Sequence, residues 1–333
     1  TSPFEKGGLR GIFFNQFESL ITNRASQGVV IHDSCARPGR ARGYTTYLAV
    51  LIISFLLLHF APVPDAHAYT ESERNVKLDA PFVPTPNYVI AEILSKARVG
   101  KDDILYDLGS GDGRIVIEAA RQTGCRAVGI EIDADLINDS LIAAKRAGVQ
   151  DRVRFIEADI FTADFREATV VTIYMGGHVN RKLRPRLLEE LKPGTRIASY
   201  CFDMGDWKPD AVSSFGKEDV YFWIIPANAS GKWQWVEGKG KSITRCDLEV
   251  RQLFQAIAGE VTCNGKRAPL QGGKITGETI SFTLTGETFE KASPVEFSGR
   301  IREHSIDGMA GSGTSRRTWK ATRNPDTTQP IAR

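Results

Sequence analysis

The chain has 333 residues, of which 41% are hydrophobic and 25% are charged, so it is long enough to bury more than one hydrophobic core. Its 43 basic and 40 acidic residues leave a formal net charge of +3, and no long run of one sign occurs. Because no basic face is indicated, we expect no nucleic-acid partner. The cysteines after residue 68 have no CxxC or Cys/His spacing, so we also expect no metal site.

The first 68 residues differ from the rest of the chain. An arginine-rich stretch, residues 37–42, precedes an uncharged stretch, residues 43–64, and the small-x-small pattern Ala66-His67-Ala68 follows. This order is typical of a cleaved export signal, but the uncharged stretch is also long enough to be a membrane anchor. Either interpretation predicts that the following domain is exported, or anchored to the membrane by this segment. No methionine occurs before Met175, so residues 1–35 are interpreted as translated upstream sequence.

An alternation of strands and helices follows this segment. Thr85 and Pro86 are predicted to be the N-cap and the first position of an amphipathic helix over residues 87–94. The predicted strands are residues 103–108, 127–131, 153–156, 169–174, 196–200, 211–215 and 220–225, and the helices between them are residues 114–122, 134–147 and 179–191. Short β-branched runs that alternate with helical patterns indicate a parallel sheet covered by helices. We therefore predict a Rossmann-like α/β domain over residues 69–227, with a seven-stranded sheet and an antiparallel edge.

The composition changes after Pro226, where helical periodicity ends and glycine turns separate short strands. The predicted strands here are residues 232–236, 245–253, 256–263, 279–284, 295–301 and 315–321. We expect a smaller all-β, barrel-like domain over residues 228–322, since closing an antiparallel sheet removes its exposed edges. The polar residues 323–333 are expected to be a disordered tail.

Cys246 and Cys263 fall on two successive strands of this β domain. If the hairpin between the strands turns at Phe254-Gln255, the two cysteines lie opposite each other. In an exported protein this placement favours a cross-strand disulfide, with two buried free thiols as the alternative.

A glycine-rich motif, Asp107-Leu108-Gly109-Ser110-Gly111-Asp112-Gly113, ends the first predicted strand. Its three glycines and Ser110 are expected to form a turn whose backbone N–H groups approach a ligand closely. The spacing is GxGxG, whereas dinucleotide sites use GxGxxG, so a nicotinamide or flavin cofactor is less favoured. A carboxylate at Asp107 would repel a phosphate but can accept a hydrogen bond from an ammonium group. The motif therefore favours a ligand that carries an amino acid.

Two further acidic residues end the neighbouring strands. Glu131, 24 residues after Asp107, is placed to accept hydrogen bonds from both hydroxyls of a ribose, with Asp133 as a rival for this role. Asp159 is placed to accept from the amine of an adenine, and Ile160 to pack on its ring. Signals at three successive strand ends are more specific than one glycine loop.

These residues together resemble class I S-adenosylmethionine-dependent methyltransferases over about residues 82–227. A narrower set, Phe82-Val83-Pro84-Thr85-Pro86, the glycine motif and Asp203-Met204-Gly205-Asp206-Trp207, is similar to bacterial proteins related to mitochondrial lysine methyltransferases. Those relatives modify the ATP synthase c-subunit and the adenine nucleotide carrier. The resemblance implies a Rossmann-like seven-stranded methyltransferase sheet, S-adenosyl-L-methionine as cofactor and lysine N-methylation of a protein substrate. A small-molecule methyltransferase of the same fold and an exported cofactor-binding protein without catalytic activity remain open, and no oligomeric state is indicated.

The candidate catalytic residues are Tyr174 and Asp203, and Thr85, His178 and Trp207 are candidates on the substrate side. Methyl transfer from a sulfonium is an in-line displacement, so the protein mainly aligns the reacting atoms and excludes water. Each candidate has a structural alternative: a core aromatic for Tyr174, a turn former for Asp203, a helix cap for Thr85, a solvated loop residue for His178 and loop packing for Trp207.

Overall fold

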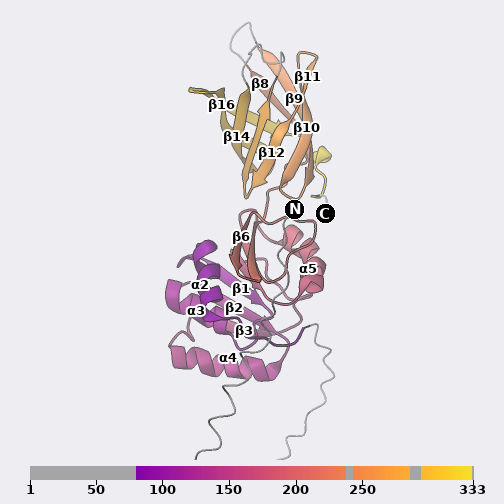
Figure 1. Ribbon diagram of the computed structural model, residues 1–333. Coiled ribbons are helices and arrows are strands. Elements are labelled where there is room, and N and C mark those ends of the chain that lie inside the picture. Colours follow the sequence, from indigo (N-terminus) through magenta and orange to yellow (C-terminus); the bar gives the residue numbers. More distant parts are fainter. Residues whose placement is uncertain (1–79, 238–242, 286–293, 332–333) are drawn as a thin grey trace, which may run out of the picture. The chain divides into compact units, whose positions relative to one another are not determined.

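The computed structural model describes residues 80–237, 243–285 and 294–331 (Figure 1). The predicted export signal or anchor, residues 1–68, lies outside the described residues. Within the described ranges, none of the helices combines the length and the apolar character needed to span a membrane.

A seven-stranded sheet is the framework of the first domain. Its strands are β1 (Ile104–Leu108), β2 (Arg126–Glu131), β3 (Val153–Glu157), β4 (Val170–Ile173), β5 (Arg196–Tyr200), β6 (Ala211–Phe215) and β7 (Glu218–Ile224). They lie in the order β3-β2-β1-β4-β5-β7-β6, and β7 is antiparallel to both of its neighbours. This sheet confirms the predicted Rossmann-like fold, including the antiparallel pair at the edge.

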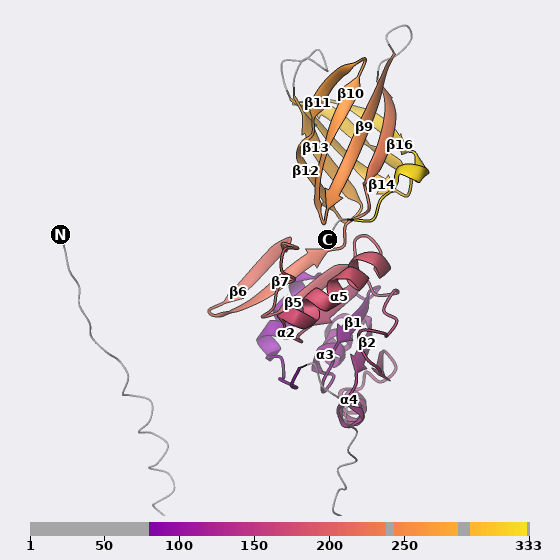
Figure 2. The ribbon, with the colours of Figure 1, turned by 90° about the vertical axis from the view of Figure 1, so that its right-hand side faces the viewer.

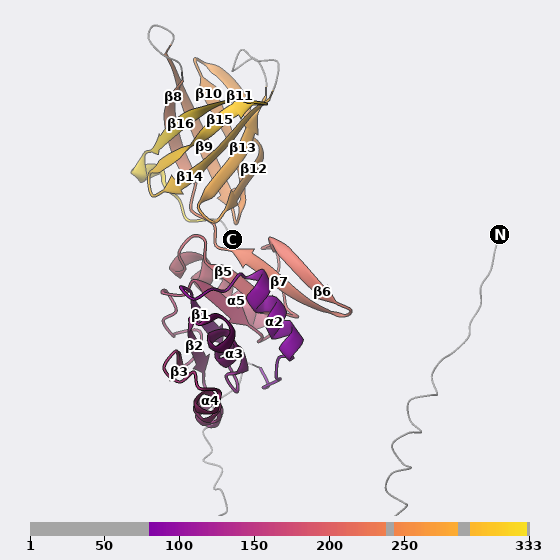
Figure 3. The same cartoon turned by 90° about the vertical axis from the view of Figure 1, so that its left-hand side faces the viewer.

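Helices cover both faces of this sheet. On one face lie α2 (Asn87–Lys96), α3 (Arg114–Thr123) and α4 (Ala134–Ala147), and on the other lies α5 (Gly177–Glu190). The face covered by α5 is toward the viewer in Figure 2, and the face covered by α2 and α3 is toward the viewer in Figure 3. Side chains of β1 alternate between the two layers, because Leu105 packs with α2 and α3 while Leu108 packs with α5. Burial on both faces explains the nearly continuous apolar character of these strands.

The cap of α2 differs from the prediction. Pro86, not Thr85, is the N-cap residue, and no side chain caps the helix. The carbonyl oxygen of Pro86 accepts hydrogen bonds from the N–H groups of Val89 and Ile90, at 3.0 and 3.1 Å, which places Pro86 just outside the helix. Thr85 is therefore one residue too early to cap α2, and its side chain is buried.

The second domain is an antiparallel barrel. Its strands are β8 (Gly231–Glu237), β9 (Thr244–Leu253), β10 (Ala256–Cys263), β11 (Lys266–Pro269), β12 (Gln271–Thr276), β13 (Thr279–Leu284), β14 (Val295–Arg302), β15 (Ser305–Ser312) and β16 (Ser315–Arg323). All except β11 form the closed ring, since β10 pairs with both β12 and β9, and β11 extends β10 as a hairpin (Figure 2). Four aromatic side chains, Trp235, Phe282, Phe297 and Trp319, fill the interior with ring centroids 4.9 to 5.9 Å apart. The barrel interior is thus a packed core.

Three strands of this barrel, β11, β12 and β15, were not among the predicted ones. Glycines account for two of these omissions. Gly272 and Gly273 lie in β12, and Gly308 and Gly311 lie in β15. A Cβ at Gly308 or Gly311 would collide with a carbonyl oxygen of a neighbouring strand. These glycines therefore allow close approach of strands, whereas in the sequence they resemble turn residues.

The prediction of a disordered tail over residues 323–333 is wrong for the part that the structure describes. The chain continues through the end of β16 into the short 3-10 helix η2 (Pro325–Thr327). The buried guanidinium of Arg323 donates to the carbonyl oxygens of Asn228 and Ser230 at 2.9 and 3.0 Å. The carbonyl oxygen of Gln329 accepts from the side chains of the same two residues. Hydrogen bonds to a distant segment order this polar stretch, and composition alone does not reveal them. Residues 332 and 333 lie outside the described residues.

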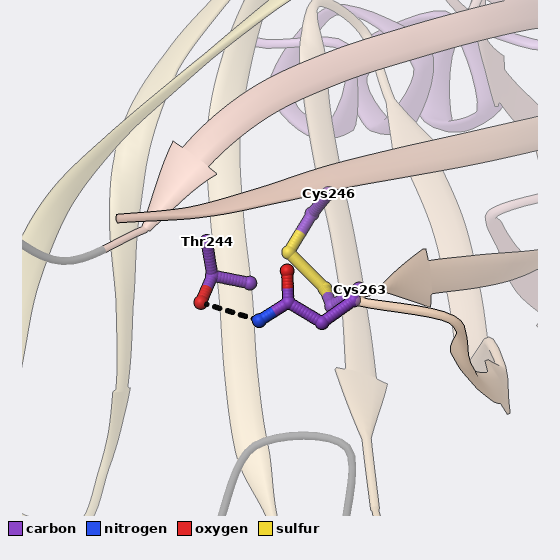
Figure 4. The surroundings of a disulfide bond; sticks show 4 residues. Thr244, Cys246 and Cys263 are labelled. Carbon is purple, nitrogen blue, oxygen red and sulfur yellow. Dashed lines mark hydrogen bonds between the residues drawn. A yellow bond between two sulfur atoms is a disulfide. The ribbon is translucent and has the colours of Figure 1, made fainter. Parts of the chain in front are cut away.

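The predicted disulfide is confirmed. Cys246 on β9 and Cys263 on β10 are directly opposite in the register and are bonded, with their Cα atoms 4.3 Å apart (Figure 4). The hairpin turns at Phe254-Gln255, because Leu253 pairs with Ala256. A side-chain hydrogen bond of 3.1 Å from Asn264, which follows β10, to Thr244, the first residue of β9, also links the ends of these strands.

Candidate active site

A pocket opens at the carboxyl edge of the parallel strands, where α/β folds of this kind bind ligands. It is bounded by the glycine loop after β1, the ends of β2, β3 and β4, and residues 80–85, which we call the strap. Nine predicted site residues line this pocket: Thr85, Asp107, Gly109, Ser110, Gly111, Glu131, Asp159, Ile160 and Tyr174. Residues far apart in the sequence therefore meet at one place.

Hydrogen bonds to the end of β2 hold the glycine loop in place. The N–H groups of Gly109 and Ser110 donate to the carbonyl oxygen of Ile130 at 2.9 and 3.0 Å. The N–H of Gly111 donates to Oε2 of Glu131 at 2.8 Å. These contacts hold the loop in the turned conformation that brings it to the pocket.

Two of the glycines are required for steric reasons. Gly111 has φ +54°, and a Cβ there would collide with the ring of Phe82 in the strap. Gly113 has φ +74° and is the N-cap of α3, outside the pocket lining, and a Cβ there would lie 2.7 Å from the ring of Phe155. A side chain at either position therefore meets both an unfavourable backbone conformation and an occupied space.

Asp107 is a buried carboxylate at the end of β1, and its side chain accepts a hydrogen bond of 2.7 Å from the hydroxyl of Thr172. Burial raises the pKa of Asp107 to about 7, the hydrogen bond from Thr172 opposes this rise, and the nearby carboxylates of Glu131 and Asp112 add to it. This environment favours a cationic partner in the pocket.

The acidic side chains at the ends of β2 and β3 make different contacts. Glu131 is buried, and its Oε1 accepts from the N–H groups of Ile132 and Asp133 at 2.8 and 3.1 Å. Together with the bond from the N–H of Gly111 to Oε2, the carboxylate accepts three hydrogen bonds from backbone N–H groups, and its oxygens can still accept from hydroxyl donors. Asp133, the rival for the ribose role, caps α4 through the N–H of Asp135. Asp159 is exposed at the pocket and accepts from the N–H of Phe161.

Arg114 ties the strap to the glycine loop. Its guanidinium donates to the carbonyl oxygen of Thr85 at 3.2 Å and forms an ion pair of 2.6 Å with Asp112. Phe82, about half exposed, lies against Gly111 from the other side. The strap, which includes the substrate-side candidate Thr85, therefore forms one wall of the pocket.

Aromatic residues that the sequence interpretation did not select lie beside Tyr174. Its ring centroid is 4.6 Å from that of Tyr200 and 6.0 Å from that of Phe202, both at the end of β5. Oε2 of Glu218 accepts hydrogen bonds from the hydroxyls of Tyr200, at 2.5 Å, and Tyr88, at 3.1 Å. Burial and then the hydrogen bond to Glu218 raise the pKa of Tyr200, so its hydroxyl remains a donor. Because β7 is antiparallel to β5, Glu218 at its start reaches the same sheet edge, a consequence of the predicted topology that local motifs do not show.

Three other predicted residues do not line the pocket. Asp203 is exposed and accepts from the N–H of Gly205, as expected of a turn former. His178 is exposed in the first turn of α5. Trp207 is fully buried and stacks on Phe254, and its Nε1 donates to Oε1 of Gln255 at 2.8 Å. Trp207 thus packs against the β9–β10 turn and does not occupy the predicted position on the substrate side.

The residues present fit S-adenosylmethionine. Asp107 would offer a buried carboxylate to the ammonium group, and the buried hydroxyl oxygen of Ser110 has no hydrogen-bond partner among the described residues. Glu131 would hold the ribose, and Asp159 with Ile160 would hold the adenine. When bound, this cofactor supplies a methyl group activated by a positively charged sulfur.

Comparison with known proteins agrees with this assignment. Residues 107–211 match the profile of the ANTKMT methyltransferase domain. The protein-lysine N-methyltransferase of Saccharolobus islandicus is 44% identical over 150 residues, which are 44% of this chain and 93% of that protein. The mouse adenine nucleotide translocase lysine N-methyltransferase is 30% identical, covering 54% of this chain and 72% of that protein. The lysine N-methyltransferase of Xenopus laevis that is named for the ATP synthase c-subunit is 32% identical, covering 45% and 66%.

A solved structure is also similar. An RNA methyltransferase from Salinibacter ruber, crystallised with S-adenosyl-L-homocysteine, is 55% identical and covers 43% of this chain and 94% of that chain, with a TM-score of 0.43.

Proposed function

Because the chain belongs to the ANTKMT family of S-adenosylmethionine-dependent methyltransferases, we propose that it methylates the ε-amino group of lysine in a protein substrate. The relatives named as lysine N-methyltransferases support this choice of acceptor.

One observation in the site carries the proposal: the aromatic ring of Tyr174 lines the same pocket as Asp107 and the glycine loop. Tyr174 directly follows β4, at the sheet edge from which an acceptor approaches. An aromatic face binds the alkyl chain of a lysine and attracts its ammonium group. Partial burial also favours loss of the ammonium proton to solvent. The neutral amine would then take the methyl group from the sulfonium of the bound cofactor, which would leave as S-adenosylhomocysteine.

Labelled methyl transfer tests this function. The purified chain is incubated with a membrane extract and a soluble extract and with cofactor carrying a labelled methyl group, and the labelled species are digested and identified by mass spectrometry. We expect the label on lysine side chains of protein, and none with Gly111→Val, whose side chain would occupy the space of the Phe82 ring. Label on RNA or on a small molecule would refute the lysine assignment while preserving methyl transfer. Binding of the cofactor without any labelled product would favour the non-catalytic alternative.

We further propose that the two described domains are exported, or held at the membrane by the N-terminal segment. The order of arginines, uncharged stretch and Ala66-His67-Ala68 supports this location. The disulfide between Cys246 and Cys263 also supports it, since disulfides persist mainly in oxidising compartments. A reporter fused after Ala68 tests the proposal, and reporter activity confined to the cytoplasm would contradict it.

A further inference from the structure

Glu218 lies in aromatic surroundings at the sheet edge that carries the pocket. Tyr174, which lines the pocket, contacts the ring of Tyr200, and Tyr200 donates to Glu218. Tyr88 donates to the same carboxylate oxygen from α2. A continuous path of contacts therefore runs from the pocket wall to this carboxylate.

The charge of Glu218 is not neutralised within the described part of the chain. Its two side-chain hydrogen bonds come from neutral tyrosine hydroxyls, and both go to Oε2. No described residue donates to Oε1 or forms an ion pair with this side chain. Glu218 is only partly buried, so its second oxygen offers a site for an incoming cation.

The backbone around this carboxylate is held in an unusual conformation. Cys201, between Tyr200 and Phe202, has φ +63°, which is rare for a residue with a side chain. Its N–H donates to the carbonyl oxygen of Asp219 at 2.7 Å, next to Glu218. The buried side chain of Asn180 on α5 donates to the carbonyl oxygen of Phe202 at 2.9 Å. These bonds fix the turn that presents Phe202 beside Tyr174, and strained backbone of this kind is concentrated at functional sites.

We propose that Glu218, with the faces of Tyr174 and Phe202, forms the subsite that binds the alkylammonium group of the acceptor before methyl transfer. The carboxylate accepts from the ammonium, and the two rings contact the alkyl chain and add cation–π attraction. Tyr88 and Tyr200 are positioning residues, since their hydroxyls orient the carboxylate. This subsite rests on the proposed lysine acceptor, and it assigns the recognition of that acceptor to Glu218, Tyr174 and Phe202.

A binding experiment that does not depend on turnover tests the subsite. The full chain, saturated with S-adenosylhomocysteine, is titrated with n-butylammonium and separately with n-butanol, and binding is followed by ligand-observed NMR. We expect the wild type to prefer the ammonium at least tenfold. Glu218→Gln keeps an acceptor for both tyrosine hydroxyls and removes the charge, so it should abolish this preference and leave butanol binding unchanged.

Glu167→Gln is the matched control, because Glu167 also accepts a tyrosine hydroxyl, that of Tyr106 at 2.8 Å, and does not line the pocket. It should keep the wild-type preference. Glu218→Asp retains the charge and should retain a weakened preference for butylammonium. This variant keeps the proposal testable if Glu218→Gln does not fold. Equal affinity of the wild type for the two probes, or an unchanged preference in Glu218→Gln, would overturn the subsite. Label found on a non-amine acceptor would refute the proposed function, whereas a Glu218-dependent preference for butylammonium would still stand.

Discussion

The hydroxyl of Thr172 donates a hydrogen bond of 2.7 Å to the buried carboxylate of Asp107, and no cationic side chain among the described residues forms an ion pair with this carboxylate. The pKa of Asp107 is about 7 because burial disfavours its charge. Binding of the cofactor's ammonium group requires the ionised form. We therefore expect affinity for S-adenosylhomocysteine to rise between pH 5.5 and 7.5, with a limiting slope of about tenfold per pH unit below the pKa.

Calorimetric titrations across this pH range check the dependence. Asp107→Asn, which cannot ionise, should bind weakly at every pH and show no slope from this site. An affinity of the wild type that is independent of pH would contradict the ammonium role of Asp107.

The same carboxylate predicts an opposite effect on stability. A folded-state pKa raised from 3.8 to about 7 means that the stability from this group is present at low pH and is lost as the pH rises toward 7. Asp107→Asn avoids this loss and still offers an oxygen to Thr172. At pH 8 and without cofactor, its free energy of unfolding should exceed that of the wild type by about 2–4 kcal/mol. Denaturant unfolding at pH 8 and pH 4.5 measures this difference, which should shrink at the lower pH.

The glycine loop gives a prediction with an internal control. Gly111 and Gly148 both have positive φ, +54° and +70°, but a Cβ at Gly111 meets Phe82 whereas a Cβ at Gly148 meets nothing within 4 Å. Alanine at either position should lower stability by about 1–2 kcal/mol through the backbone conformation. Only Gly111→Ala should also weaken binding of S-adenosylhomocysteine, by at least tenfold, because it displaces the strap.

Calorimetry on both variants separates these effects. Adding Phe82→Ala to Gly111→Ala removes the collision and should recover part of the affinity. Equal loss of affinity in Gly111→Ala and Gly148→Ala would show that the conformational penalty alone is responsible.

The cofactor half of the pocket was predictable because its residues follow strand ends. In a parallel sheet the carboxyl ends share one edge, so Asp107, Glu131 and Asp159 had to meet once the strands were recognised. The strands of the first sheet and its antiparallel edge followed from periodicity, and the disulfide followed from hairpin symmetry.

The proposed acceptor subsite was less predictable, because contacts between distant segments decide it. Glu218 begins an antiparallel strand, and nothing local distinguishes it from the other acidic residues. Trp207 was a candidate on the substrate side with loop packing as the alternative, and packing with Phe254 buries it. Tertiary packing of this kind has no periodic signature in the sequence.

The disulfide predicts how the two domains respond to reduction. Cys246 and Cys263 close a loop with a sequence separation of 17, and a loop of about this length contributes roughly 3 kcal/mol in the chain-entropy description. The double substitution Cys246→Ala with Cys263→Ala should lower the barrel's unfolding temperature by about 10 °C or more. Affinity for S-adenosylhomocysteine should persist at temperatures at which the barrel stays folded, because neither cysteine lines the pocket. Thermal unfolding with and without a reductant checks this account. The reductant should lower the unfolding temperature of the wild type to that of the double variant and leave the variant unchanged. A further decrease in the variant would show that the reductant acts elsewhere.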